Sequence, residues 1–231
     1  MMRQKNISIY ISRAVISIIL VITCAQVSAQ SYKKIKKVQE KDSTALFRGF
    51  SVSADLVGPL MLKLSDYGQY EAALKINLKD KYFPTVEIGY GKADHQEATG
   101  INYKTSAPYF RVGCDFNILK NKHDTNVLYA GFRYAYTSYK DDINHPDFKD
   151  PVWGYNVRYE VTGNSCYYHW LEAVIGVDSK IIGPLHLGWS VRYKYRLASD
   201  EGAIDKSWYV PGFGISNSSR LSGTFNVIID I

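Results

Sequence analysis

Residues 185–195 read LHLGWSVRYKY, and this stretch indicates how the rest of the chain folds. Apolar and polar side chains alternate along it without interruption. One set is apolar or aromatic: Leu185, Leu187, Trp189, Val191, Tyr193 and Tyr195. The intervening set is polar or small: His186, Gly188, Ser190, Arg192 and Lys194. Because successive side chains of a β-strand point to opposite faces, the stretch predicts a strand with one apolar and one polar face.

The same alternation occurs in seven further stretches, so we predict eight strands in all. The seven are residues 50–57, 70–77, 84–91, 109–118, 128–136, 171–178 and 221–231. Their polar faces carry charges and glycines deep within the strands, whereas their apolar faces are almost uncharged. In a narrow barrel the polar face points inward, where small residues leave room for buried ion pairs. The sequence therefore predicts an all-β, antiparallel, up-and-down transmembrane β-barrel, with a soluble periplasmic β-domain as the alternative.

The links between these stretches alternate in length. Residues 78–82, 119–126 and 180–184 are short, whereas 92–108, 137–168 and 197–220 are long and polar. This pattern is typical of outer-membrane barrels, which have short periplasmic turns and long external loops. Residues 151–162 and 208–216 have some strand character and would raise the number of strands to ten. We interpret them instead as ribbons that project beyond the membrane.

The orientation can be checked with the outward-facing residues near the external ends of the strands. In six of the eight strands these residues are aromatic: Tyr70, Tyr90, Phe110, Tyr136, Tyr167 and Tyr195. Aromatic side chains concentrate at membrane–water interfaces. We therefore expect these six residues to form an outer aromatic girdle.

The inward faces carry a set of charged and polar residues that we expect to form a network in the lumen. Its members are Glu87, Arg111, Asp115, Arg133, Glu172, Arg192, Asp178 and His186. Because an unpaired buried charge is strongly destabilising, these groups must be paired. If the turn at 180–184 is centred on Ile182, Glu172 lies opposite Arg192. We expect a filled lumen that is closed by ion pairs, and a small gated pore is the alternative.

The same turn register places Asp178 opposite His186, with Ser190 on the same face. A barrel-embedded hydrolase would need these three groups within hydrogen-bonding distance at an accessible mouth. The pair falls at the periplasmic end, however, and the lumen of an eight-stranded barrel is normally filled. We therefore expect a structural hydrogen bond there, no catalytic residues and no enzymatic activity.

The N-terminus has the features of a secretory signal peptide. Arg3, Lys5 and Arg13 precede an apolar run, residues 14–25, that is too short to span a bilayer. Small residues at 27–29 predict cleavage near Ala29/Gln30. A retained anchor and a lipoprotein modified at Cys24 are the alternatives. The expected organisation is a signal peptide (1–29), a basic periplasmic leader (30–48) and an outer-membrane barrel (49–231).

The net charge of +6 comes mostly from the signal peptide and the leader. Nucleic-acid binding requires a basic face on the fold, so we expect no nucleic-acid partner. The five histidines lack metal-ligand spacing, and we predict no cofactor and no metal. The expected partners are outer-membrane lipid, the barrel-insertion machinery, and an external ligand or a host or glycan surface contacted through the long loops. We expect the protein to be a monomer in the bacterial outer membrane.

Two motifs, YVPGFG at 209–214 and IGPLHLGW at 182–189, follow a signal that ends in Ala29-Gln30. With these features the chain resembles, over residues 49–231, a Bacteroidales outer-membrane β-barrel family that is a domain of unknown function. Its architecture is similar to that of the OmpA transmembrane domain. It departs from such barrels in ending with Ile231 where they usually end with Phe. The motifs that carry the resemblance are structural, so it implies a protein of the cell envelope and carries over no catalytic residue.

Overall fold

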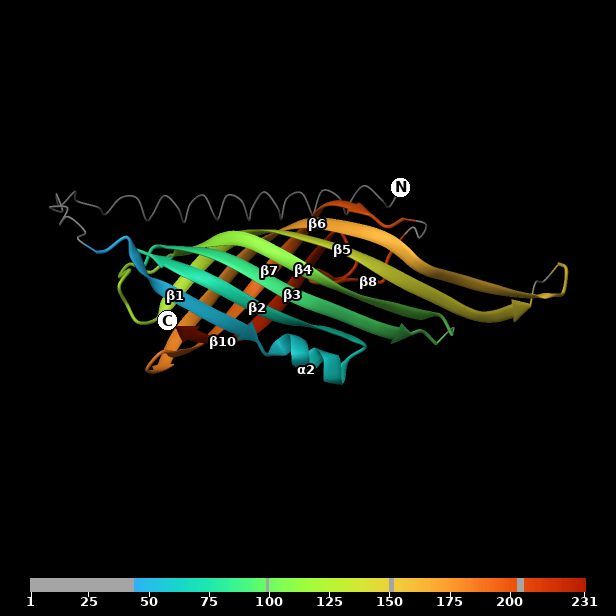
Figure 1. Cartoon of the computed structure of the whole chain (residues 1–231), viewed down its shortest axis with the longest axis horizontal. Coiled ribbons are helices and arrows are strands. Elements are labelled where there is room, and N and C mark those ends of the chain that lie inside the picture. Colours follow the sequence, from blue (N-terminus) through green and yellow to red (C-terminus); the bar gives the residue numbers. More distant parts are fainter. Residues whose placement is uncertain (1–43, 99, 150–151, 203–205) are drawn as a thin grey trace, which may run out of the picture. The chain divides into compact units, whose positions relative to one another are not determined.

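The computed structural model describes residues 44–98, 100–149, 152–202 and 206–231 (Figure 1). The predicted signal peptide and most of the predicted leader lie outside the described residues. The long strands are β1 (Phe47–Asp55), β2 (Tyr67–Leu78), β3 (Tyr82–Gln96), β4 (Asn102–Asn117), β5 (Val127–Lys149), β6 (Asn156–Ile182), β7 (Leu185–Asp200) and β10 (Ser219–Asp230). A helix, α2 (Val57–Leu64), and a small ribbon of β8 (Tyr209–Val210) and β9 (Gly214–Ile215) complete the described elements.

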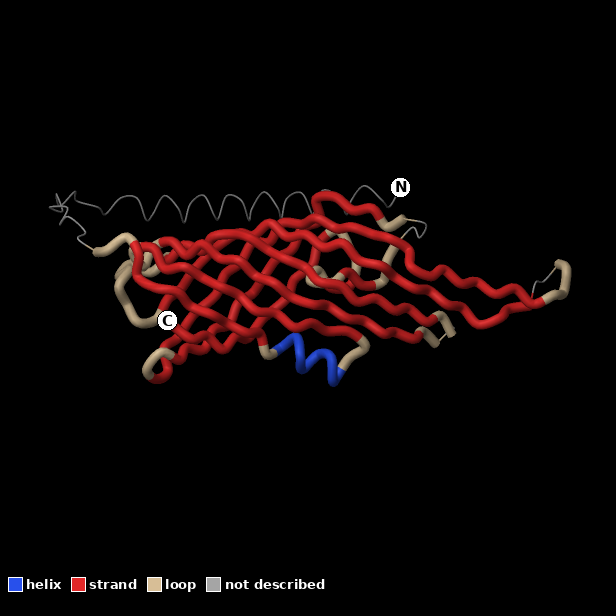
Figure 2. Tube along the Cα trace, in the orientation of Figure 1, coloured by secondary structure: helices blue, strands red, loops and turns tan. Residues whose placement is uncertain are grey.

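The eight long strands form one closed antiparallel barrel in the order β1-β10-β7-β6-β5-β4-β3-β2. Each strand pairs with its neighbours along the chain, and β1 pairs with β10 to close the ring. Figure 2 shows how completely strands dominate the described residues. The predicted all-β barrel of eight strands is confirmed, and the ten-strand alternative is wrong.

Strands extend further than the sequence pattern predicts. β5 and β6 remain paired as far as Lys149↔Asn156, through most of the stretch predicted to be a polar link. Residues 156–162, which we interpreted as part of a separate ribbon, are the start of β6. The prediction failed because these extensions have a polar outer surface, which removes the contrast between the two faces.

The helix α2 was not predicted, and the strand expected at 50–57 ends earlier, at Asp55. The Asp55 carboxylate accepts hydrogen bonds from the backbone N–H groups of Val57 (3.2 Å) and Gly58 (2.8 Å). These bonds satisfy donors that a helix N-terminus leaves without partners. Pro59 lies in the first helical turn, where its missing N–H has no consequence.

The register between β6 and β7 differs from the prediction. Ile182 pairs with Leu185 and Asp178 pairs with Gly188, so the hairpin is centred on Gly183 and not on Ile182. Gly183 has a positive φ of 54°, which a glycine adopts without strain. When the centre of the hairpin moves by one residue along the chain, the cross-strand partner of each residue shifts by two positions. Glu172 consequently lies opposite Lys194.

Charged side chains lie inside the barrel and apolar side chains lie outside, which is the reverse of the usual distribution in a water-soluble protein. Arg111, Asp115 and Glu87 are almost completely buried inside the barrel. Ile175 and Trp189, on the outer surface, are largely exposed. The barrel wall therefore separates a charged interior from an apolar exterior.

Candidate functional site

Glu87 on β3 is the centre of the ion-pair network in the lumen. Its Oε2 atom lies 3.0 Å from Nη1 of Arg111 and 2.7 Å from Nη1 of Arg192. Its Oε1 atom lies 2.6 Å from Nε of Arg133. The three arginines come from β4, β7 and β5, so a single carboxylate connects strands on opposite sides of the barrel.

Two further glutamates balance these arginines toward the end of the barrel beyond which β5 and β6 extend. Glu172 Oε1 lies 2.9 Å from Nε of Arg111, and Glu172 Oε2 lies 3.6 Å from Nη1 of Arg192. Glu71 Oε1 lies 3.1 Å from Nη1 of Arg192, and Tyr109 donates a hydrogen bond of 2.7 Å to Glu71. The structure thus brings Glu172 and Arg192 together, but the shorter contact of Glu172 is with Arg111.

A second group lies toward the end of the barrel at which the β6–β7 hairpin turns. Arg133 donates two hydrogen bonds, of 2.7 Å and 2.9 Å, to the two carboxylate oxygens of Asp115. Lys75 lies 3.0 Å from Asp178 and 3.5 Å from Asp115, and its ammonium group lies 4.3 Å from the centre of the Tyr129 ring. The cavity at this level has a volume of about 20 Å³. That is space for about one water molecule, so the side chains fill the lumen at this level.

The three residues considered for a hydrolase are not brought together. His186 Nε2 lies 3.0 Å from Asp230, whereas Asp178 binds Lys75. The Ser190 hydroxyl forms a 2.8 Å hydrogen bond with Thr224. The expected Asp178–His186 hydrogen bond is therefore wrong, because of the shifted hairpin register.

The segment 208–216, which we call the plug, folds into the barrel instead of projecting from it. Its centre is a β-turn in which the N–H of Phe213 donates to the carbonyl of Val210 (3.1 Å). Pro211 and Gly212, the latter with a φ of 81°, occupy the positions that a type II turn favours for these residue types. Val210 and Phe213 are completely buried.

The plug is bound to the network by its carbonyl groups. The Gly212 carbonyl accepts hydrogen bonds from Arg111 (2.9 Å) and Lys194 (2.7 Å). The Phe213 ring packs against Tyr168 and Trp170 at centroid distances of 4.9 Å and 5.7 Å. The sequence signal for this arrangement was present, since YVPGFG is an apolar turn motif within a polar link.

A second buried cluster lies above the plug, where the strands extend. The Asp141 carboxylate accepts hydrogen bonds from Ser207 (2.9 Å) and Asn164 (2.9 Å). Burial, together with the neighbouring charge of Asp141, raises the pKa of the Cys166 thiol to about 12. This thiol is therefore protonated and contributes to packing. The sequence pattern had placed Asp141 in the long polar link at 137–168.

The predicted girdle residues lie on the outer surface of β2 to β7. In the sheet register Tyr70 is opposite Tyr90, and Phe110 is opposite Tyr136, with 5.5 Å between the last two ring centroids. Tyr167, within β6, and Tyr195, within β7, are also exposed. The six aromatic side chains thus follow one another around this part of the wall.

Among the described residues, no group of three or more His, Cys, Asp or Glu side chains is arranged to hold a metal ion. No helix in the described ranges has the length and apolarity needed to cross a membrane.

Comparison with known proteins gives one family match. Residues 11–230 match the family described as a domain of unknown function, DUF6048. No curated protein matches the sequence.

Two solved structures are similar to the chain in fold. The crystal structure of Neisserial surface protein A (NspA) has 11% sequence identity and a TM-score of 0.38, and the match covers 80% of this chain and 99% of NspA. The structure of Ail, the attachment invasion locus protein of Yersinia pestis, in complex with the heparin analogue sucrose octasulfate has 9% identity and a TM-score of 0.36. That match covers 79% of this chain and 93% of Ail.

Proposed function

We propose that this chain, which belongs to the DUF6048 family of unknown function, is a non-enzymatic outer-membrane barrel protein. Its lumen is filled, and its long external strands contact the surroundings of the cell or support the envelope. The observation that carries this proposal is the closed eight-stranded barrel with ion pairs inside and apolar side chains outside.

The outer surface supports placement in a membrane. Ile175, Trp189 and Leu221 are 61%, 64% and 67% exposed, although each is a large apolar side chain. Contiguous apolar patches of more than a few hundred Å² are rare on soluble monomers and mark protein or membrane contacts. Hydrocarbon solvates this surface, and closure of the barrel pairs the backbone groups of the strands along most of their length.

The interior supports a plugged barrel in preference to an open pore. The Glu87 network crosses the lumen from β3 to β7, and the plug covers it from the external side. An ion entering from either end would have to break several charge-assisted hydrogen bonds. A small gated pore is the second candidate. The plug is held by hydrogen bonds from Arg111 and Lys194 to the Gly212 carbonyl, and its departure would remove the cover from the external side of the network.

The length of β5 and β6 supports an external role. β6 has 27 residues. At about 3.3 Å per residue it is roughly three times as long as a hydrocarbon core of about 30 Å. Figures 1 and 2 show β5 and β6 running on past the other strands. We assign this extension to contact with an external ligand, a host surface or a glycan.

The experiment uses the mature chain, which we propose begins at Gln30. After refolding into vesicles it should resist extraction by alkaline carbonate, and planar bilayers containing it should show no single-channel current. Discrete conductance steps would favour the pore. Recovery in the soluble fraction, or N-terminal sequencing that finds Met1 retained in cells, would contradict the membrane assignment.

A further inference from the structure

The barrel wall is interrupted near the external end of β1. The β1–β10 pairing stops at Asp55↔Asn226, and the β1–β2 pairing stops at Ala54↔Ala72. β10 nevertheless continues outward to Ser219, and β2 begins at Tyr67. Between these two strand segments the wall is formed by α2 in place of a strand.

The helix is held on one side of this gap more closely than on the other. A Cβ atom on Gly58 would lie 2.2 Å from the Gln69 carbonyl oxygen, so α2 packs directly on β2. Toward β10, the contacts are the backbone hydrogen bond from Leu56 N–H to the Phe225 carbonyl (2.8 Å) and the bond from Phe225 N–H to the Asp55 carboxylate (3.1 Å). Both lie at the base of the gap.

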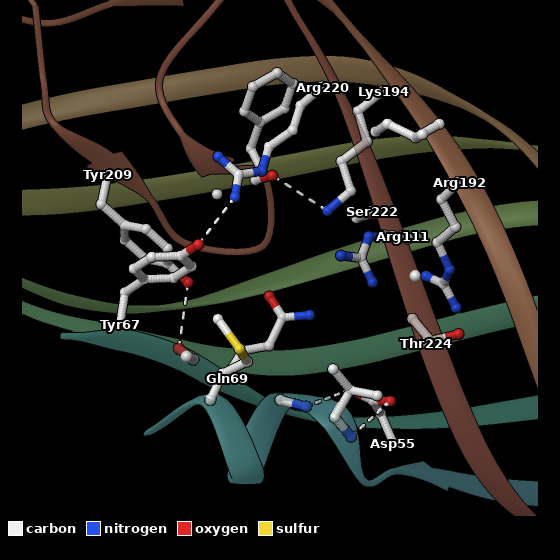
Figure 3. A pocket seen from close by; sticks show the side chains of 18 residues that line it. Asp55, Tyr67, Gln69, Arg111, Arg192, Lys194, Tyr209, Arg220, Ser222 and Thr224 are labelled. Carbon is white, nitrogen blue, oxygen red and sulfur yellow. Dashed lines mark hydrogen bonds between the residues drawn. The ribbon is translucent and has the colours of Figure 1, made fainter. Parts of the chain in front are cut away.

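A cavity of about 240 Å³ lies behind the gap and extends into the lumen. Four basic residues line it, namely Arg111, Arg192, Lys194 and Arg220, whereas Asp55 is its one acidic lining residue. In Figure 3 the four basic side chains lie on one side of the cavity, and Asp55 and Gln69 lie on the other. The Asp55 carboxylate is already occupied by three backbone N–H groups.

Two of the four basic residues form no ion pair with a carboxylate, although Glu172 is the cross-strand neighbour of Lys194. Within the described ranges, neither Lys194 nor Arg220 lies at ion-pair distance from an acidic side chain. Lys194 is 4% exposed and donates to the carbonyls of Gly212 and Phe213, while Arg220 donates to the Tyr67 hydroxyl (3.1 Å). The buried hydroxyl oxygen of Ser222, on the same wall, has no hydrogen-bond partner.

These two basic residues are also neighbours across the sheet, and both lie against the plug. Arg220 and Lys194 are direct cross-strand partners in the β10–β7 ladder, and both point inward. Like charges in directly opposed positions destabilise a sheet. An anion between them would reverse this unfavourable interaction and would provide an acceptor for Ser222.

An apolar groove of about 610 Å³ on the outer wall adjoins the cavity. The two share Val57, Gly223 and Thr224 in their linings. Outward-facing Ile175, Trp189, Val191 and Phe225 line the rest of the groove. Gly223 makes the hollow, because a Cβ atom there would have no neighbour closer than 3.8 Å.

We propose that an anionic lipid binds at this gap, with its phosphate between Lys194 and Arg220 and an acyl chain in the groove over Gly223. The depth of the cavity in the membrane supports a lipid as its occupant. The girdle residue Tyr195 is opposite Ser219, immediately before Arg220, and such aromatic rings mark the boundary between headgroups and hydrocarbon. The inference goes beyond the proposed function but rests on its membrane placement.

The test titrates the refolded mature chain, in non-ionic detergent micelles, with dioleoyl phosphatidic acid and with dioleoyl phosphatidylcholine, and counts bound lipid by native mass spectrometry. Phosphatidic acid should bind at least about tenfold more tightly. Arg220→Gln should reduce that binding by about tenfold, the effect of one charge-assisted hydrogen bond. Gly223→Leu should also reduce it, because the new side chain points outward and fills the groove.

Matched variants separate this site from general effects. Lys104→Gln removes one positive charge from an exposed pair with Asp94, and Val112→Phe enlarges an outward residue on β4, away from the groove. Both should bind phosphatidic acid as the wild type does. Equal losses in Lys104→Gln and Arg220→Gln, or no preference for phosphatidic acid, would overturn the proposal.

A soluble anion is the remaining occupant to test. Glycerol 3-phosphate and inorganic phosphate should fail to displace phosphatidic acid, because neither has an acyl chain. Displacement by either at similar concentrations would make this a soluble-anion site and would contradict the lipid assignment. Carbonate extraction of the same preparation tests the membrane placement separately, so failure of one proposal is distinguishable from failure of the other.

Discussion

At the scale of single residues, the lumen depends most on Glu87, whose two carboxylate oxygens bind three guanidinium groups. We expect Glu87→Gln to lower the free energy of unfolding by about 3–5 kcal/mol, because it leaves buried arginines with insufficient negative charge. Urea-dependent unfolding from vesicles measures this. The control is Asp94→Asn, which breaks the half-exposed 3.3 Å pair with Lys104 and should cost less than about 1 kcal/mol. Equal costs would mean that the network adds no stability.

Asp80 provides a pH-dependent test in the turn between β2 and β3, outside the membrane-spanning part of the strands. Burial alone would raise the pKa of its carboxyl group, but hydrogen bonds from His123 (2.7 Å) and Asn77 (2.8 Å) and the charge of Arg48 hold the pKa below its ordinary value. A carboxyl whose folded pKa is depressed stabilises the fold above its unfolded pKa, near about 4, and loses this contribution as the pH falls through the folded pKa.

We therefore expect the melting temperature of the wild type to fall more steeply than that of Asp80→Asn when the pH is lowered from 5 to 3. Thermal unfolding followed by circular dichroism across this interval measures the difference. Asp124→Asn, at an exposed position of the β4–β5 link, should keep the slope of the wild type. The same slope in Asp80→Asn would show that the Asp80 contacts do not stabilise the fold.

At the scale of elements, the plug tests how the external end is closed. Gly212 has a φ of 81°, and a Cβ atom there would lie 2.5 Å from Cγ of Tyr109. Gly183 also has a positive φ, of 54°, but a Cβ atom there would meet nothing within 4 Å. Gly212→Ala should therefore cost several kcal/mol and dislodge the plug, whereas Gly183→Ala should cost only the backbone strain of about 1–2 kcal/mol. Thermal unfolding gives the costs, and faster proteolysis at 208–216 in Gly212→Ala reports displacement. Equal costs for the two variants would mean that the Tyr109 side chain moves aside to accommodate the new Cβ atom.

The strands could be predicted from the sequence, since alternation such as that of 185–195 depends only on the two faces of a strand. The register in which the strands pair was harder to predict from the sequence. A β-hairpin register depends on where the turn closes, and Gly183 is as compatible with the pattern as Ile182. The plug and α2 were missed because both are specified by contacts with residues far along the chain: Gly58 against Gln69, and Gly212 against Tyr109. The charged residues of the lumen were found, but not the central position of Glu87, which requires three strands to be brought together.

At the scale of the whole molecule, the barrel and a soluble β-domain assign different surroundings to the same apolar side chains. In a soluble domain Val191 and Ile175 would form part of a core sealed by protein. In the structure they are cross-strand partners on the outer wall, 54% and 61% exposed. Their neighbours Ser190 and Gly176 are also partners, but they face inward and are buried. The two pairs differ by one residue along each strand and thus lie at nearly the same depth in the bilayer.

This arrangement gives the most direct test of the membrane assignment. Ile175→Arg should cost about 2–4 kcal/mol in vesicles, because hydrocarbon near the midplane cannot solvate the charge. Spin labels at Val191 and Ile175, in bilayers, should collide readily with oxygen, which concentrates in hydrocarbon, and rarely with a water-soluble nickel complex. A label at Ser190 should be shielded from both reagents, because the lumen there is filled by protein. If the labels at Val191 and Ile175 were shielded in the same way, these side chains would belong to a protein core and the outer-membrane assignment would be wrong.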